Sequence, residues 1–194
     1  LHPQLSIDLS FSDRTVDLIE EGFDLAVRIG PLHDSGTLSA RLLGTQHISI
    51  GASPAYLARH GTPRNLEELD GHSVIGYSSA GVIAPWNALP ATGQRGNSGQ
   101  RSQVRSQISM DDIQAIAAAA VAGYGIAWVP CWLLSSYVKR GELVHILPEY
   151  RARSYEIHAL WPQTRQVRRK LRVAIDALVT ETPDLLNVDE APKR

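Results

Sequence analysis

Residues 109–130, SMDDIQAIAAAAVAGYGIAWVP, decide the fold of this 194-residue chain. Ser109 and Asp112 form a capping signal, in which short polar side chains accept hydrogen bonds from the free amides of a first helical turn. The apolar positions that follow recur at helical spacing, and the alanines let the helix lie close to a sheet. Gly123 ends the helix, and Gly125 turns the chain into a short apolar strand, IAWVP. The stretch therefore predicts a helix, a turn and a buried strand in succession.

A strand is predicted at residues 104–108, directly before this helix. Strand, helix and strand then form a βαβ unit, whose two strands are parallel. In open α/β sheets the carboxyl ends of strands and the amino ends of helices meet at one edge, where ligands bind. The functional interpretation is that residues 109–112 line a ligand cleft. The alternative, an ordinary capped helix, is equally consistent with the sequence.

The first part of the chain predicts a similar unit. Residues 5–11 alternate apolar and polar, as in a strand; residues 14–21 have helical spacing; and residues 23–30 form a second, nearly continuous apolar run. Long strands at 46–53 and 154–161 could pass between the two units. We therefore expect an α/β fold of two lobes, with a small-molecule pocket where the lobes meet.

The remaining segments fill in the two lobes. Further predicted elements are helices at residues 54–60, 132–138 and from 167, with strands at 73–77 and 141–148. Residues 77–90 read as irregular, and 91–105 as a polar, Gly-rich loop.

Composition excludes several classes of protein. The net charge is −1, so the whole chain has no electrostatic preference for nucleic acid, and the basic run at residues 165–172 is interpreted as the solvated face of a helix. One cysteine, Cys131, excludes an internal disulfide framework. No apolar run approaches the roughly 20 residues that a membrane span needs. The chain begins with Leu1 and not Met, so we expect a fragment of a longer protein.

Motifs for catalysis and cofactors are missing. The sequence contains no G-x-S-x-G, P-loop or H-E-x-x-H, and its GYG lacks the third glycine of a dinucleotide fingerprint. The seven histidines are scattered. Neither a metal, nor a cofactor, nor a pair of nucleophile and base is therefore predicted, which argues against an enzyme.

Several stretches, taken together and in order, resemble the LysR-type transcriptional regulators. They are GFDLAVRIGPL, ARLLG, ASPAYLARHGTPRNLEELDGH, SMDDIQAIAAAAVAGYGIAWVPCWL and GELVHILP, followed by a closing helix. The resemblance extends from about residue 3 to about residue 178. It is most specific where ASPAYLARHG and AGYGIAWVP occur together in register.

The resemblance implies an effector-binding domain similar to a type 2 periplasmic binding protein, with two Rossmann-like subdomains joined by two crossover strands. Subdomain I would comprise residues 1–52 and 156–181, subdomain II residues 53–155, and a flexible tail residues 182–194. Family domains open with a further strand and helix, which this chain lacks before residue 3. We therefore expect either a clipped chain or an incomplete pocket.

The resemblance also assigns a ligand cleft by position. The implied ligand-binding residues are Ser12, Ile29, Gly30 and Pro31 in the first lobe, and Ser78, Ser79, Ser109, Asp111, Val129 and Pro130 in the second. Ser53 and Pro54 would lie at the hinge. Short hydroxyls and backbone amides suit a small metabolite that carries a carboxylate, although each serine could equally make an ordinary loop hydrogen bond.

The implied function is effector sensing in a cytoplasmic, DNA-binding transcription regulator. Family members form homodimers, often paired as tetramers, and bind DNA through an N-terminal winged helix-turn-helix that this chain does not contain. No membrane association is expected. The alternative is a secreted solute-binding protein of a transporter, which would have the same fold. An enzyme that uses the same cleft is a third hypothesis.

Overall fold

The computed structural model describes residues 5–12, 16–32, 35–79, 82–84, 88–90, 106–152, 154–164 and 167–186. The chain divides into two compact units. Unit 1 comprises Leu1–Thr45 and Tyr155–Leu186, and unit 2 comprises Gln46–Ser154 with Asn187–Arg194. Within residues 1–186 the chain leaves unit 1 after Thr45 and returns to it at Tyr155. The predicted bounds of the two subdomains, and the tail at 182–194, stay predictions.

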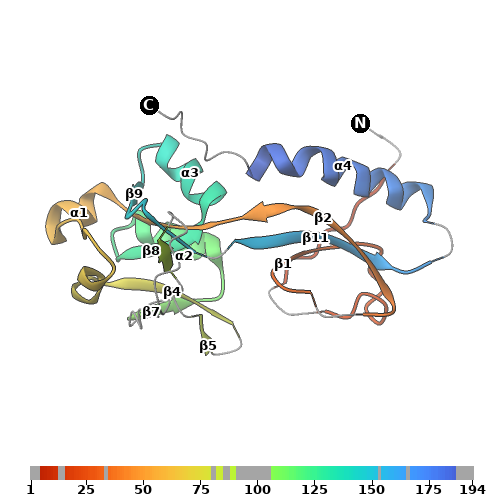
Figure 1. Ribbon diagram of the computed structural model, residues 1–194, viewed down its shortest axis with the longest axis horizontal. Helices are drawn as coiled ribbons and strands as arrows, with labels where there is room; N and C mark the ends of the chain where they lie inside the picture. Colours follow the sequence, from red (N-terminus) through yellow and green to blue (C-terminus); the bar gives the residue numbers. More distant parts are fainter. Residues whose placement is uncertain are drawn as a thin grey trace. The chain divides into compact units, whose positions relative to one another are not determined.

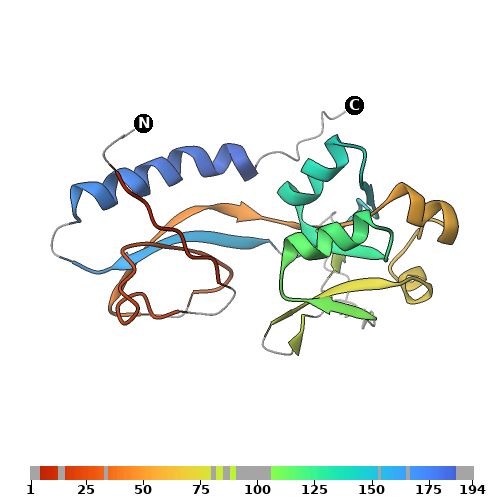
Figure 2. The same cartoon turned by 180° about the vertical axis from the view of Figure 1, so that it is seen from behind.

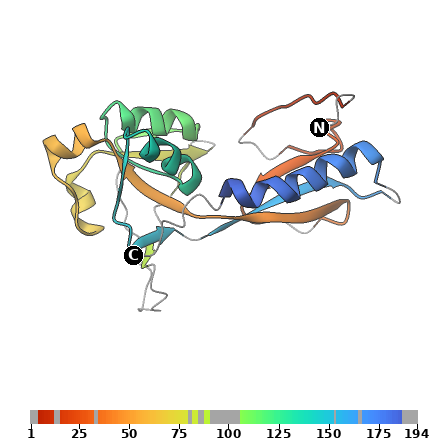
Figure 3. The same ribbon diagram turned by 90° about the horizontal axis from the view of Figure 1, so that it is seen from above.

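Unit 1 contains a three-stranded sheet and a long helix. The sheet has the order β1-β11-β2, with β1 at Ala26–Ile29, β11 at Tyr155–Pro162 and β2 at Leu38–Gln46. The helix α4, Arg169–Leu186, lies along β2 and β11 (Figures 1 and 3). Its apolar stripe packs on Leu43, Ile157 and Ala159, while Arg41 and Asp176 approach within 3.9 Å at the surface. Helix α4 continues through Pro183, so residues 182–186 are helical.

Two predictions for the first lobe are wrong. Residues 5–12 form no strand, and residues 16–22 form only turns where a helix was expected. The strand β1 pairs antiparallel with β11, so the predicted parallel βαβ unit is not formed. A strand needs a neighbouring strand to pair with, and residues 5–12 belong to none of the described sheets. Their alternating apolar side chains face solvent instead, with Phe11 92% exposed.

Unit 2 is a mixed sheet covered by helices. Its main sheet has the order β5-β4-β8-β3-β9, with β7 pairing on β4. The strands are β3 (Ile48–Ala52), β4 (Val74–Ser79), β5 (Val82–Ile83), β7 (Ile108–Met110), β8 (Ile126–Pro130) and β9 (Val144–Ile146). A separate antiparallel pair joins β6 (Ala88–Pro90) and β10 (Tyr150–Ala152). The irregular stretch predicted at 77–90 therefore contains short strands.

The helices of unit 2 cover both faces of the sheet. The helices α1 (Pro54–His60) and α3 (Cys131–Lys139) lie close to their predicted positions, and a 3₁₀ helix, η1, spans Glu67–Gly71. The helix α2 is Ile113–Val121 and lies beside α3 (Figures 2 and 3). Successive residues of one strand, Ile126 and Ala127, belong to different core clusters, one with α1 and η1 and the other with α2 and α3. This two-sided burial explains why IAWVP is apolar throughout.

The βαβ prediction for the deciding stretch is confirmed, with shifted bounds. Both β7 and β8 pair in parallel with β4, which lies between them, and α2 connects them. The capping prediction is wrong in its choice of residue. Asp112, not Ser109, is the N-cap of α2, and its Oδ1 accepts hydrogen bonds from the amides of Gln114 and Ala115 at 2.7 and 2.9 Å. Ser109 lies in β7, three residues too early to reach them.

Candidate functional site

Three parallel strands of unit 2 direct their carboxyl ends to one edge of the sheet. Gly76 is opposite Ser109 in the β4–β7 pair, and Ile75 is opposite Ala127 in the β4–β8 pair. The ends of the three strands, at Ser79, Met110 and Pro130, therefore lie along the same edge. This edge gathers the predicted second-lobe residues, Ser78, Ser79, Ser109, Asp111, Val129 and Pro130.

The polar groups at this edge are hydroxyls and carboxylates. Ser109 is exposed, and its side chain makes no hydrogen bond with a residue that the structure describes. Asp111 is exposed beside it, and the carboxylate of Asp112 is engaged by the first-turn amides of α2. Since Asp112 occupies the favourable end of the helix dipole, an anionic ligand gains little there. The edge is better suited to hydroxyl, amide or cationic groups of a ligand.

The two serines at the end of β4 lie in a strand and not in the irregular stretch predicted from residue 77. Ser78 and Ser79 belong to β4 itself and pair with Ile83 and Val82 of β5, so they are in a hairpin and not in a loop. The side chain of Ser78 is half-buried. Backbone pairing holds both residues in place, which gives this part of the edge a defined geometry.

At the end of β8, a ligand would contact backbone groups and not side chains. Val129 is fully buried and packs in the core cluster under α2 and α3. Pro130 pairs with Ile48 of β3 and is the N-cap of α3. A ligand at this point would meet the turn from β8 into α3 and not the Val129 side chain.

The predicted residues of the first lobe lie in unit 1. Ile29 ends β1 and is half-exposed, and Pro31 is exposed after it. Gly30 is buried, and its amide donates to the Glu156 carbonyl at 2.9 Å. Ser12 is exposed in the segment without regular structure. The residues at 29–31 are thus adjacent to one another at the end of one strand.

The predicted hinge residues lie inside unit 2. Ser53 is buried and caps α1, its Oγ accepting the amide hydrogen of Tyr56 at 3.3 Å, and Pro54 is the first helical residue. Both follow β3 directly. Their role as a hinge stays a prediction.

The sequence analysis missed a buried contact beside the end of β8. Trp132 Nε1 donates to Gln46 Oε1 at 2.9 Å, and the Cys131 amide donates to the His47 carbonyl at 2.9 Å. Gln46 is buried at the point where the chain enters unit 2. The available signal was a polar residue between two apolar strands, LLGTQHISIGA, because a buried amide requires a partner.

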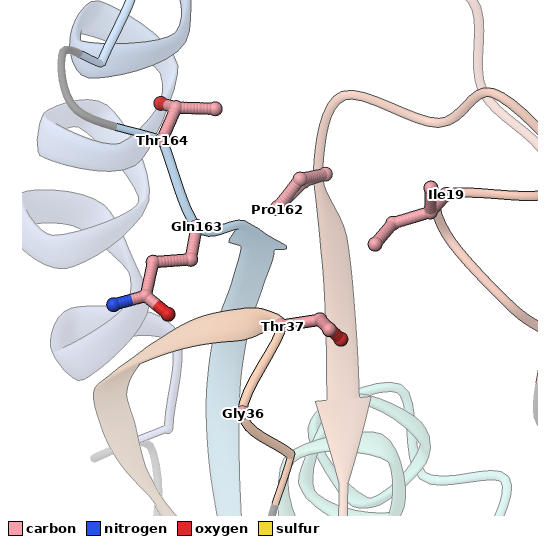
Figure 4. Close-up of a pocket in the computed structure, with 6 residues that line it drawn as sticks. All are labelled: Ile19, Gly36, Thr37, Pro162, Gln163 and Thr164. Carbon is pink, nitrogen blue, oxygen red and sulfur yellow. The ribbon is translucent and has the colours of Figure 1, made fainter.

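A hollow in unit 1 is lined by none of the predicted site residues. It has a volume of about 500 Å³ and is lined by Ile19, Gly36, Thr37, Pro162, Gln163 and Thr164. Figure 4 shows the Thr37 side chain directed toward Ile19 and the Gln163 amide turned away from it. None of the six lining residues is charged.

Among the described residues, no group of three or more His, Cys, Asp or Glu side chains could hold a metal ion. No helix in the described part of the chain is long and apolar enough to cross a bilayer.

Comparison with known proteins connects the fold to a family. The model of the LysR substrate binding domain matches residues 1–183. An uncharacterized HTH-type transcriptional regulator of Haemophilus influenzae is 37% identical over 170 residues, 88% of this chain and 57% of the relative. The HTH-type transcriptional regulator CrgA of Neisseria meningitidis is 32% identical, with 93% of this chain and 58% of the relative covered. The chain therefore spans a little over half the length of these relatives.

Solved structures agree with this relationship. The regulatory domain of CrgA, a LysR-type transcriptional regulator from Neisseria meningitidis, has a TM-score of 0.76 at 31% identity, covering 88% of this chain and 80% of that one. The regulatory domain of AphB in Vibrio vulnificus has a TM-score of 0.74 at 25% identity, covering 92% and 85%. The fold is thus that of LysR-type regulatory domains, as the sequence predicted. The chain belongs to the LysR substrate binding domain family.

Proposed function

We propose that this chain is the effector-sensing part of a LysR-type transcription regulator. In this proposal, a small metabolite binds to this domain and thereby controls transcription. The observation that carries the proposal is the family match, which extends over residues 1–183. The ordered strand edge of unit 2, with Ser78 and Ser109 among its residues, supports a binding site at the predicted place.

The proposed mechanism makes and breaks no covalent bond. An effector that binds one arrangement of the two units more tightly shifts the population toward that arrangement. The size of the shift is limited by the difference between the two affinities, and about 1.4 kcal/mol corresponds to a tenfold change. Catalysis is not part of the proposal, because the relatives are transcriptional regulators.

The proposed effector is a small polar metabolite. A carboxylate remains our chemical expectation, but Asp111 and the capping Asp112 place two negative charges at the start of α2. A carboxylate would therefore bind away from α2, toward the Ser78 hydroxyl. Hydroxyl or ammonium groups of the same molecule would lie nearer to Ser109 and Asp111.

The proposed partners follow the family. We propose a homodimer or tetramer, located in the cytoplasm, that contacts DNA through an N-terminal winged helix-turn-helix encoded upstream of Leu1. The secreted solute-binding alternative has no support from the relatives, whose names describe HTH-type regulators.

The gene upstream of Leu1 provides the first test. A helix-turn-helix followed by a linker helix is the expected result. A signal peptide in place of a DNA-binding segment would overturn the proposal and favour the transport receptor.

Ligand binding provides the second test. Metabolites, beginning with small carboxylates, are titrated against the protein while tryptophan emission is recorded, and a true effector changes the emission saturably. The variants Ser109→Trp and Ser12→Trp should block binding by bulk, whereas Ser136→Trp on α3 is a control away from the strand edge. Unchanged affinity in both blocking variants would remove the assigned site.

A further inference from the structure

Tyr56, His60 and His72 form a polar aromatic cluster in unit 2 that the proposed binding site does not use. Tyr56 is 2% exposed, and its Oη lies 3.2 Å from His72 Nδ1. The Tyr56 ring stacks on His60 one turn later in α1, with centroids 4.5 Å apart and planes at 26°. A buried hydroxyl between two histidines is a site where a single proton can change the hydrogen bonding.

A third partner favours one direction for the hydrogen bond between Tyr56 and His72. The amide of Ser73 donates to Tyr56 Oη at 2.9 Å, so the phenol oxygen already serves as an acceptor. All of these groups are paired when the phenol hydrogen is donated to an unprotonated His72 Nδ1. This arrangement corresponds to a neutral His72 imidazole with its hydrogen on Nε2.

Protonation of His72 is incompatible with this arrangement. An imidazolium carries hydrogens on both nitrogens, so Nδ1–H and the Tyr56 O–H would be directed at each other. If the hydroxyl turns to accept from Nδ1–H, its own hydrogen loses its partner inside the core. Either outcome leaves a buried polar group without a hydrogen bond, which is unfavourable.

The Tyr56 hydroxyl connects two elements. Tyr56 lies in the first turn of α1, where its amide donates to the capping Ser53. Ser73 directly precedes β4, and its carbonyl accepts from the Ile126 amide of β8 at 2.9 Å. One side chain thus joins α1 to the point where the central strands of the sheet begin.

We propose that the hydrogen bond between Tyr56 and His72 is a proton-sensitive latch, which holds α1 to the sheet at neutral pH and loosens it when His72 is protonated. The latch is a property of unit 2 and does not depend on an effector. Under the proposed function it would have a regulatory consequence, because α1 begins at the predicted hinge, Ser53 and Pro54. Acid would then change the response to the effector.

The surroundings of His72 set the pH range. Burial lowers the pKa of His72 below 6.5, the nearby His60 lowers it further, and Glu68 on η1 partly opposes both. The folded protein thus binds this proton less readily than the unfolded chain. The stability that neutral His72 provides is complete above pH 6.5 and is lost as the pH falls through the lower folded value.

The first experiment is an NMR titration of the histidine side chains in the full chain. The expected result is an Nε2–H tautomer for His72 at pH 7.5 and a midpoint below that of a free histidine. The variant His60→Gln should raise the midpoint, and Glu68→Gln should lower it, because each removes one of the two opposing charges. An Nδ1–H tautomer of His72 at pH 7.5, measured in the wild-type protein, would by itself refute the proposal.

The second experiment follows thermal unfolding at pH 7.5 and pH 5.5. His72→Asn keeps an acceptor near the Nδ1 position but cannot titrate, so it should lose less Tm on acidification than the wild type, by about 2–4 °C for a domain of this size. His47→Asn changes a histidine of the same unit outside this cluster and is the matched control. Equal acid sensitivity of His72→Asn and the wild type would refute the latch.

Tyr56→Phe tests the hydroxyl directly. Without the phenol, the neutral form of His72 loses its hydrogen bond, so the titration midpoint should rise, and the Ser73 amide should exchange faster with solvent. An unchanged midpoint would refute the proposal. If Tyr56→Phe does not fold, the tautomer of His72 and the acid sensitivity of His72→Asn still test the proposal. A negative result would leave the effector and DNA tests of the proposed function unaffected.

Discussion

Gly125 shows how one residue enforces the turn between α2 and β8. A Cβ atom at this position would overlap the carbonyl oxygen of Ser73, which accepts the hydrogen bond from the Ile126 amide. Two backbone segments come together here because no side chain separates them. Gly123, two residues earlier, adopts a φ of 82° after the end of α2. The two glycines of GYG thus have different physical roles, one conformational and one steric.

The first prediction concerns this close approach. Gly125→Ala should destabilise unit 2 by about 1–3 kcal/mol, because the added methyl group displaces the backbone of Ser73. Gly71→Ala, where a Cβ meets no atom within 4 Å, should change the stability by less than about 0.5 kcal/mol. Urea denaturation of both variants measures the difference. Equal stability of the two variants would mean that the turn accommodates the added methyl group without a loss of stability.

The second prediction concerns the cap of α2. Asp112→Ala should cost about 0.5–2 kcal/mol, because the amides of Gln114 and Ala115 lose their acceptor. Asp111→Ala is the matched control, since this neighbouring carboxylate is exposed and does not cap the helix. Thermal unfolding should separate the two variants. A larger loss for Asp111→Ala would contradict the assignment of the cap.

The contrast between Ser109 and Asp112 shows what local sequence can and cannot predict. Both residue types are strong N-caps, so the presence of a capped helix was predictable. Which of them caps depends on where β7 ends, and β7 extends to Met110 because it pairs with β4. That pairing joins segments more than thirty residues apart, so the residues around the cap do not reveal it. The cap was therefore placed three residues too early.

At the scale of elements, the alanines of α2 allow the helix to pack closely on the sheet. Ala117 and Ala120 are fully buried against the sheet, whereas Ala118 on the opposite side is exposed. Because protein interiors are close-packed, a larger side chain at these positions would have to displace its neighbours. The alanine-rich sequence thus serves packing on one face and helix propensity on the other.

The third prediction compares these two faces. Ala117→Leu should destabilise the protein by about 1–3 kcal/mol through overpacking. Ala118→Leu adds the same three carbons to the exposed face and should change the stability by less than about 0.5 kcal/mol. Both residues have the same intrinsic helix propensity, so the comparison isolates burial. Similar losses in the two variants would show that α2 does not pack on the sheet as described.

Elements differ in how far the sequence predicts them. Helices α1, α3 and α4 and strand β8 carry their own signals, such as Pro54 at a first helical position or an apolar run bounded by glycine. Residues 5–11 carry an equally clear alternation, yet they form no strand. An alternation of apolar and polar residues indicates which side of a strand would be buried. The backbone N–H and C=O groups of a strand, however, need a neighbouring strand as their hydrogen-bond partner. Local sequence does not provide that neighbour.

At the scale of the whole molecule, the two units differ in their cores. The described core of unit 2 has two clusters of nine buried residues each, on the two faces of its sheet. The described cluster of unit 1 has three, Leu43, Ile157 and Ala159, under α4. Since apolar burial is the main stabilising contribution, we expect unequal stability of the two units.

The fourth prediction follows from this inequality. A variant that retains only Trp161 reports on the core of unit 1, and one that retains only Trp128 reports on unit 2. In urea, the Trp161 signal should change at a lower concentration than the Trp128 signal. Circular dichroism, which detects both units, should then show a broad transition. Coincident midpoints for both probes would mean that the chain unfolds as one cooperative body.

The position of β1 at the end of its sheet has a practical consequence. One side of Ala26–Ile29 is paired with β11, and within the described sheet the other side carries no strand, while Val27 and Ile29 are half-exposed. Such an edge is a template on which a strand from another molecule can add, and repeated addition is how fibrils grow. We therefore expect concentrated solutions of this protein to precipitate slowly. The substitution Val27→Lys should slow the precipitation, because a charged side chain on an edge strand disfavours the addition of another strand.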